Sequence, residues 1–208
     1  MDLHIDHVVY ATADADAAAQ RLWDEHGLAS VAGGQHPAWG TANRIVPLGA
    51  AYLELMTIFD PELAATNELG RIVAGRIEAG DGFIGWMVGG PAFDDRVAAN
   101  GLVAGRFSRE RPDGSQLTWR LAGLETMLAE PPLPGLLAWD DPAAFPGLAP
   151  VEHRTAPAGI AWVELAGDEE RLRRYVGDAD LPLRFVDGEP GVKRAAVALQ
   201  SGGEIILA

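Results

Sequence analysis

The chain has 208 residues, of which 48% are hydrophobic and 22% charged, enough for one large domain or for two small modules that share a core. Its formal net charge of −14 repels nucleic acid and anionic lipid, so we expect neither as a partner. Cysteine is absent, which excludes disulfides and thiolate sites and fits a cytoplasmic location. We expect no membrane span and no signal peptide, because the sequence has no long apolar run and no signal-like leader.

The first 60 residues predict one strand, one helix and three further strands. Residues 3–10 alternate as a strand that contains His7. Asp14 or Asp16 can cap a helix that Gly27 ends. Three strands then follow, at 29–34, 43–48 and 51–59. We therefore assign residues 1–60 to a first βαβββ module.

The same order of elements recurs twice further along the chain. A connecting helix is predicted over 61–81, because its apolar residues fall on one face. A second βαβββ module is predicted over 82–140, with a Pro-Asp-Gly hairpin turn between two of its strands. A Pro-rich crossover over 141–158 leads to a C-terminal β-α-β module over 159–208, packed in the same domain.

The strands of the three units can be superposed. Equivalent positions on equivalent strands face the same way, because side chains alternate along a strand. The first strands place three residues in one column: His7, Trp86 and Trp162. The last strands place three others in a second column: Glu54, Ala138 and Ile206.

This repeated order, with a histidine in its first strand and a glutamate in its last, resembles the vicinal oxygen chelate superfamily of glyoxalase I, extradiol dioxygenases and bleomycin-resistance proteins. Four segments are similar to its glyoxalase-like domain family: "IDHVVYATAD", "GGQHPAWGTANRIVPLGAAYLELM", "RPDGSQLTWR" and "EHRTAPAGIAWVEL". The resemblance implies an α+β fold, in which βαβββ modules form a curled, cup-like mixed sheet, here with an extra half-module.

The resemblance also implies a divalent metal ion, with His7 and Glu54 as its ligands in the first module. The matching columns of the other modules hold no ligand, so a third would have to come from His36, His153 or Glu204. Two ligands hold a divalent ion poorly. We expect an ion that is weakly bound or absent, with zinc, nickel, manganese and iron not distinguishable, and no nucleotide cofactor.

Each of these polar residues also has a structural interpretation. His7 and Glu54 can form a buried ion pair, because an unpaired carboxylate on a buried strand face is costly. His36 lies in a loop or strand edge between glycines and a proline, where it can serve a site or bond nearby backbone. His153 lies in the Pro-rich crossover, where the sequence favours an exposed loop residue over a ligand.

The predicted ligand-binding residues are mostly aromatic. Trp86, Trp162 and Trp39 can wall a cup around a flat or apolar ligand, or they can simply pack in the core. Asn43 and Arg120 complete this set. Trp119 precedes Arg120, so only one of the two can enter a shared cavity. A cluster of arginines could attract an anionic ligand, and part of it matches the family's hairpin with Asp113: Arg106, Arg109, Arg111 and Arg120.

Three functions follow from these observations. The first is a glyoxalase-like enzyme, a lyase or isomerase, acting on a small carbonyl- or enol-bearing metabolite, with Glu54 or His36 moving the proton. The alternative is a non-catalytic small-molecule-binding protein of the bleomycin-resistance type. The third is cofactor-free isomerisation or lactone chemistry with a His–Glu pair. We expect a monomer or homodimer.

Overall fold

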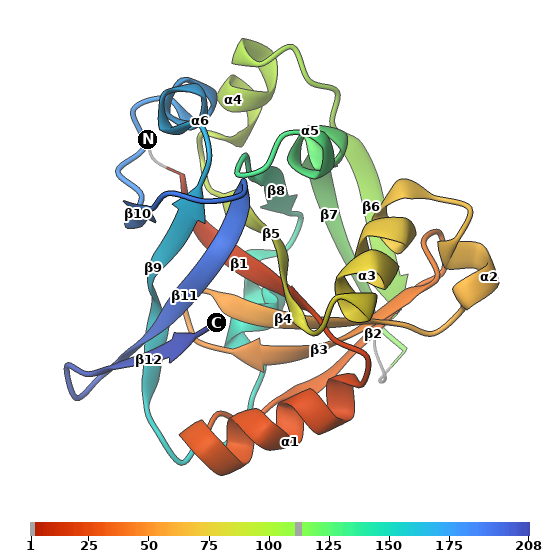
Figure 1. Ribbon diagram of the computed structural model, residues 1–208, viewed down its shortest axis with the longest axis vertical. Coiled ribbons are helices and arrows are strands. Elements are labelled where there is room, and N and C mark those ends of the chain that lie inside the picture. Colours follow the sequence, from red (N-terminus) through yellow and green to blue (C-terminus); the bar gives the residue numbers. More distant parts are fainter. Residues whose placement is uncertain (1–2, 111–113) are drawn as a thin grey trace.

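The computed structural model describes residues 3–110 and 114–208, and two βαβββ modules make up most of it (Figure 1). The first consists of β1 His4–Ala11, α1 Ala15–His26, β2 Val31–His36, β3 Thr41–Pro47 and β4 Tyr52–Ile58. The second consists of β5 Gly82–Gly89, α4 Phe93–Ala99, β6 Gly105–Glu110, β7 Gln116–Ala122, α5 Leu124–Ala129 and β8 Gly135–Trp139. The sequence did not predict α5.

The two modules share one eight-stranded sheet in the order β2-β3-β4-β1-β5-β8-β7-β6. In each module the first strand runs parallel to the last, β1 beside β4 and β5 beside β8. The modules join where β1 and β5 pair antiparallel at the centre of the sheet. The sheet curls until its two edge strands approach, and the Arg109 side chain on β6 donates a hydrogen bond to the Gly33 carbonyl on β2. The predicted α+β fold with a curled mixed sheet is confirmed.

The local signals fix the ends of the helices. The Asp14 carboxylate accepts hydrogen bonds from the backbone N–H groups of Asp16 and Ala17, and Gly27 ends α1 with φ of 69°. The single helix predicted over 61–81 is wrong. It is divided into α2 Pro61–Ala64 and α3 Glu68–Glu78, because Asn67 starts a new helix by accepting from the Gly70 N–H at 2.8 Å.

The C-terminal unit keeps the predicted order of elements but not the strand order of the other two. It consists of β9 Pro157–Ala166, α6 Glu169–Val176, β10 Leu183–Phe185, β11 Gly191–Leu199 and β12 Glu204–Leu207. Its strands form a second sheet in the order β10-β9-β11-β12. Because β12 does not pair with β9, Ile206 on β12 does not occupy the place that Glu54 has beside β1. The crossover before β9 contains two short 3₁₀ helices, Pro142–Ala144 and Pro146–Leu148.

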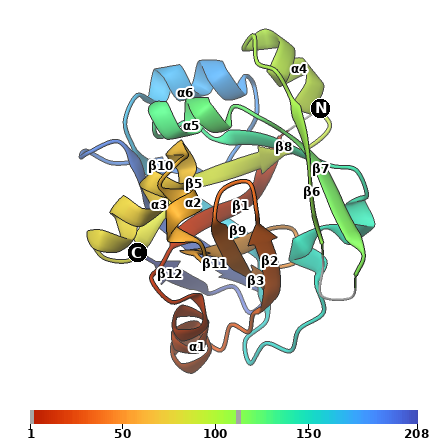
Figure 2. The ribbon, with the colours of Figure 1, turned by 90° about the vertical axis from the view of Figure 1, so that its right-hand side faces the viewer.

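The second sheet packs against one face of the first. Val8 and Leu53 of the large sheet share a hydrophobic core with Val163 and Leu165 of β9. The other face of the large sheet is covered at one end by α3 and α5. In both ribbon views α1 lies at the bottom of the molecule and α4, α5 and α6 lie at the top (Figures 1 and 2). Within residues 3–110 and 114–208, no helix has the length and apolar character needed to span a membrane.

Candidate functional site

A cavity of about 60 Å³ opens on the face of the large sheet that the second sheet does not cover. Its walls combine a small set of polar side chains with aromatic and aliphatic ones. The polar residues are His7, His36, Asn43, Tyr52, Glu54 and Arg109. The others are Val9, Trp39, Ile45, Met56, Leu69, Ile84, Met87, Trp119, Leu121, Leu124, Met127, Leu137 and Trp139.

His7 on β1 and Glu54 on β4 meet in this cavity. The two strands are adjacent and parallel, and the Nε2 atom of His7 lies 3.4 Å from the Oε2 atom of Glu54. The imidazole ring also stacks on Tyr52, with ring centroids 4.3 Å apart. Both side chains are buried, at 3% and 6% relative exposure for the residues. The predicted approach of His7 and Glu54 is confirmed.

Burial and charge act in opposite directions on this pair. Burial lowers the pKa of His7, but hydrogen bonds and charge from Asp6 and Glu54 outweigh it and raise the pKa to about 9. Burial raises the pKa of Glu54, but His7, His36 and the Asn43 amide outweigh it and lower the pKa to about 2. At neutral pH the two side chains therefore form a buried imidazolium–carboxylate ion pair.

Asp6 and Asn43 complete the polar network at either end of the pair. The Nδ1 atom of His7 lies 2.7 Å from the Oδ1 atom of Asp6, whose other oxygen accepts a hydrogen bond from the Trp139 indole at 2.9 Å. The Asn43 Nδ2 donates to Glu54 at 2.5 Å. Asn43 Oδ1 is buried with no hydrogen-bond partner in the described part of the chain. The imidazolium is thus held between two carboxylates, one in the cavity and one behind it.

His36 is the second histidine in the cavity, and its charge state differs from that of His7. Its Nδ1 atom lies 3.1 Å from the Thr41 hydroxyl, and its ring meets Trp39 edge-on. Burial lowers its pKa, so it is neutral at neutral pH. Within residues 3–110 and 114–208 no hydrogen bond engages its Nε2 atom. His36 therefore presents an uncharged imidazole to the cavity.

Two predicted wall residues lie elsewhere. Trp86 is fully buried between the sheets and donates its indole N–H to the Pro132 carbonyl at 2.8 Å. Trp162 lies in the second sheet, where its indole donates to Glu204 at 2.8 Å and Arg184 lies over its ring. Neither lines the cavity, so the expectation that one of them does so together with His36 is wrong.

Some of the other residues predicted for the site line the cavity, and others do not. Arg120 pairs with Asp94 at 2.6 Å, on the opposite face of β7 from Trp119, which does line the cavity. His153 ties the crossover to the first module: its Nδ1 accepts from the Ala29 N–H at 3.0 Å, and its Nε2 lies 2.8 Å from the Pro47 carbonyl. His153 and Glu204 are therefore outside the cavity, whereas His36, Trp39 and Asn43 line it.

The second module faces the cavity with apolar side chains at the positions that match His7 and Glu54. The counterparts follow from the strand pairing. In the first module, Glu54 on β4 pairs with Val9, which lies two residues after His7 on β1. On β5 and β8, the residue two after Met87 is Gly89, and Gly89 pairs with Leu137. Met87 and Leu137 are thus the counterparts, and the superposition on Trp86 and Ala138 is wrong by one residue. A shift of one residue along a strand exchanges its faces.

These donors do not fit the divalent site that the superfamily resemblance implies. A catalytic zinc needs about three protein ligands, and a non-haem iron needs two histidines and a carboxylate. No three His, Asp or Glu side chains gather in metal-binding geometry anywhere in residues 3–110 and 114–208. Met87 and Leu137 bring no nitrogen or oxygen donor, and His7 and Glu54 already pair with each other. We therefore derive no step through a metal.

Sequence reasoning missed several residues of the site. Asp6 precedes His7 and carries the buried carboxylate that a buried histidine often needs, so its position was a usable signal. Tyr52 and Trp139 carried no such signal. Arg109 was named with the other arginines of the cluster, and of the three described members, Arg106, Arg109 and Arg120, it is the one that lines the cavity. Arg111 and Asp113, which match the family's hairpin, lie outside the described residues.

Comparison with known families agrees with this architecture. The family model described as the glyoxalase-like domain matches residues 5–176. The chain belongs to this family. As a glyoxalase-like domain protein it is a member of the vicinal oxygen chelate superfamily, which its sheet of paired βαβββ modules also indicates. No curated protein sequence matches the chain.

Several solved structures are similar to the chain at low sequence identity. A hypothetical protein from Staphylococcus aureus is 12% identical with a TM-score of 0.67, and the match covers 99% of each chain. Methylmalonyl-CoA epimerase from Mycobacterium tuberculosis is 19% identical with a TM-score of 0.44, over 65% of this chain and 85% of that one. The Streptomyces coelicolor methylmalonyl-CoA epimerase in complex with 2-nitronate-propionyl-CoA is 18% identical with a TM-score of 0.47, over 66% and 97%.

Proposed function

We propose that this glyoxalase-like domain protein is an enzyme that moves a proton on a small carbonyl- or enol-bearing metabolite, using its own side chains. One observation carries the proposal: two histidines and a glutamate in different charge states converge on one cavity whose lining is mostly apolar. They are the protonated His7, the ionised Glu54 and the neutral His36. Groups held in separate charge states by their surroundings are typical of acid–base sites.

His36 is the group that accepts the proton. A general base works best when its pKa lies near the working pH, and the pKa of Glu54, at about 2, is too low for that. The neutral imidazole of His36 has its Nε2 uncommitted in the described structure and can take a proton from the carbon beside the carbonyl. The electron pair of the broken C–H bond then moves to the carbonyl oxygen as an enolate.

His7 stabilises the enolate oxygen. Its Nε2 lies 3.4 Å from Glu54, longer than a good N–H···O hydrogen bond, so the N–H can be shared with a substrate oxygen. Glu54 is a positioning residue, because together with Asp6 it keeps His7 protonated. Return of the proton from His36 to carbon gives the isomerised or exchanged product.

Deuterium exchange tests this proposal without knowledge of the natural substrate. Pyruvate and pyruvamide are incubated with the protein in D2O, and loss of the methyl proton signal is followed by NMR. We expect exchange above the buffer rate for at least one of them, and a fall of about a hundredfold or more in His36→Asn. His4→Gln, an exposed residue of β1, is the matched control and should leave the rate unchanged. Exchange no faster than in buffer, or unchanged in His36→Asn, would overturn the proposal.

A binding protein is the second candidate, and a specific observation favours it. Three tryptophans line the cavity, Trp39, Trp119 and Trp139, and aromatic walls of this kind suit a flat or apolar ligand. This function predicts binding of aromatic ligands with quenching of tryptophan fluorescence but no deuterium exchange. The exchange experiment therefore separates the two candidates.

A further inference from the structure

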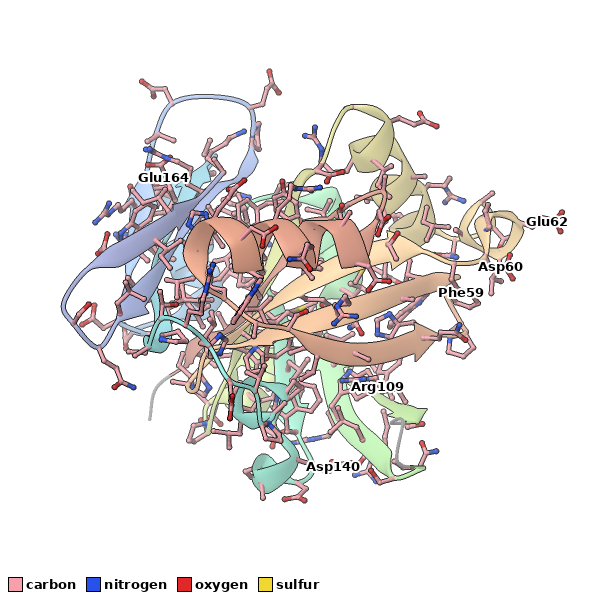
Figure 3. All side chains as sticks on the ribbon, turned by 90° about the horizontal axis from the view of Figure 1, so that it is seen from below. Phe59, Asp60, Glu62, Arg109, Asp140 and Glu164 are labelled. Carbon is pink, nitrogen blue, oxygen red and sulfur yellow. The ribbon has the colours of Figure 1, made fainter. Side chains whose placement is uncertain are left out.

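The Arg109 guanidinium lies where the two edges of the large sheet meet. Arg109 is on the edge strand β6, and Gly33, whose carbonyl accepts its hydrogen bond, is on the edge strand β2, 76 residues away in the chain. Figure 3 shows Arg109 between the strands of the first module and β6. Only 9% of Arg109 is exposed. The contact closes a seam between two strands that form no backbone ladder in the described structure.

Arg109 lines two spaces. On one side it lines the cavity that holds His7 and Glu54. On the other it lines a groove of about 270 Å³ between β2 and the crossover. The groove is otherwise mostly apolar: Val31, Ala32, Gly33, Ile45, Ala143, Ala144, Phe145, Pro146, Leu148, Ala149 and Pro150. Arg109 and Ile45 line both spaces, so the guanidinium lies where the groove and the cavity come closest to each other.

The charge of Arg109 reaches the groups that would do the chemistry. Burial lowers the pKa of His36 and raises that of Tyr52; the charge of Arg109 adds to the lowering at His36 and opposes the rise at Tyr52. A guanidinium offers several N–H donors in one plane and binds a carboxylate with two parallel hydrogen bonds. The chain as a whole carries −14 and repels anions, so a buried cation at this place acts against the overall field.

We propose that Arg109 makes the site selective for small substrates that carry a carboxylate, which accepts hydrogen bonds from the guanidinium on the side that faces the cavity. The inference rests on the proposed function of the cavity as the site of reaction, and it names the substrate class. Because Arg109, His7 and His36 line one cavity, we expect a 2-oxo acid held by Arg109 to place its carbonyl near the two histidines.

Pyruvate and pyruvamide test this assignment, because they have nearly the same shape and differ in charge. Their affinities are measured by ligand-observed NMR titration, which does not depend on turnover. We expect the wild-type protein to bind pyruvate about tenfold more tightly or better, the range that a hydrogen bond to a charged group gives. Arg109→Met should abolish this preference, and Arg109→Lys, which keeps the charge, should retain part of it.

Arg106→Met is the matched control. Arg106 lies on the same strand, is largely exposed and pairs with Asp140 at 3.3 Å, so its loss should leave the preference unchanged. Equal affinities in the wild type, or a preference that survives in Arg109→Met, would overturn the inference. If Arg109→Met does not fold, two measurements still test the inference. They are the preference of the wild type for pyruvate over pyruvamide and the reduction of that preference in Arg109→Lys.

The two proposals fail in different ways. Selective binding of pyruvate without deuterium exchange would leave the role of Arg109 standing and remove the proposed catalysis. Exchange of both compounds with equal affinities would keep the catalysis and remove the role of Arg109.

Discussion

The two modules of the large sheet have the same topology but face the cavity with opposite chemistry. The first presents His7 and Glu54, which form an ion pair between adjacent parallel strands. The second presents Met87 and Leu137 at the matching positions of β5 and β8. One half of the cup therefore holds the ion pair, and the other supplies apolar side chains at the matching positions, which strengthen the pair by excluding water. The second half also brings the Arg109 guanidinium to the cavity, from β6. The symmetric fold carries an asymmetric site.

The largest effect should come from replacing His7 by methionine, the residue at the matching position of the second module. This change should lower the free energy of unfolding. His7→Met removes the imidazolium and leaves the buried carboxylates of Asp6 and Glu54 facing the place where it stood. Loss of one partner from a buried charge pair costs about 3–5 kcal/mol. We expect a loss of this size in the free energy of unfolding at pH 6, measured with urea. A loss below about 1 kcal/mol would show that the pair contributes little.

The charge of His7 also makes the free energy of unfolding depend on pH, and His7→Met tests this dependence. The folded pKa of His7 is raised from 6.5 to about 9, so its stabilisation is complete below pH 6.5 and is lost as the pH rises through 9. That of Glu54 is lowered from 4.5 to about 2, so its stabilisation is complete above pH 4.5. We expect the wild type to lose roughly 3 kcal/mol between pH 6.5 and 9, and His7→Met to lack this decline.

Making the second module resemble the first should create a metal site. Met87→His with Leu137→Glu places donors opposite His7 and Glu54, and zinc affinity measured by calorimetry should rise at least about tenfold over the wild type. Met87→His with Ala138→Glu is the matched control, because residue 138 points away from the cavity wall that Leu137 forms. An equal gain in the control, or tight zinc binding by the wild type, would contradict the matching of the two modules.

The smallest effect should come from replacing single tryptophans, and it should appear in ligand affinity and fluorescence quenching. Trp139 lines the cavity and donates to Asp6, whereas Trp86 lies in the core between the sheets. We expect Trp139→Phe to weaken ligand binding by a fewfold, with loss of one hydrogen bond to a charged group, and to reduce quenching by aromatic ligands. Trp86→Phe should leave both unchanged. Quenching that depends on Trp86 instead would place the ligand between the sheets.

Much of this asymmetry could be predicted from the sequence, and the rest depended on register. The resemblance to the vicinal oxygen chelate superfamily was enough to bring His7 toward Glu54, and the alternation along one strand was enough to send Trp119 and Arg120 to opposite faces. The match between modules failed by one residue, because short apolar strands superpose almost equally well in either register, and the β1–β5 pair contains two irregularities. A local pattern does not fix which face of a repeated strand is buried.

Other features depend on contacts between distant segments. The strand order of the second sheet follows from packing of the whole unit, so the recurring order of its elements suggested a repeat that is not present. The bond from Arg109 to Gly33 joins residues 76 apart and exists only because the sheet curls. The cap at Asn67 was readable in the sequence, but the apolar periodicity on both sides of it favoured one continuous helix.

The protonation state of His7 tests the central claim most directly. The chain has five histidines, and ¹⁵N NMR of the labelled protein, with His7→Met for assignment, reports whether each ring carries one proton or two. The ion pair predicts that both nitrogens of His7 are protonated at pH 7 and that the ring titrates near pH 9. A neutral His7 at pH 7, with an unprotonated Nε2 facing Glu54, would contradict the account and leave that nitrogen available as a metal ligand.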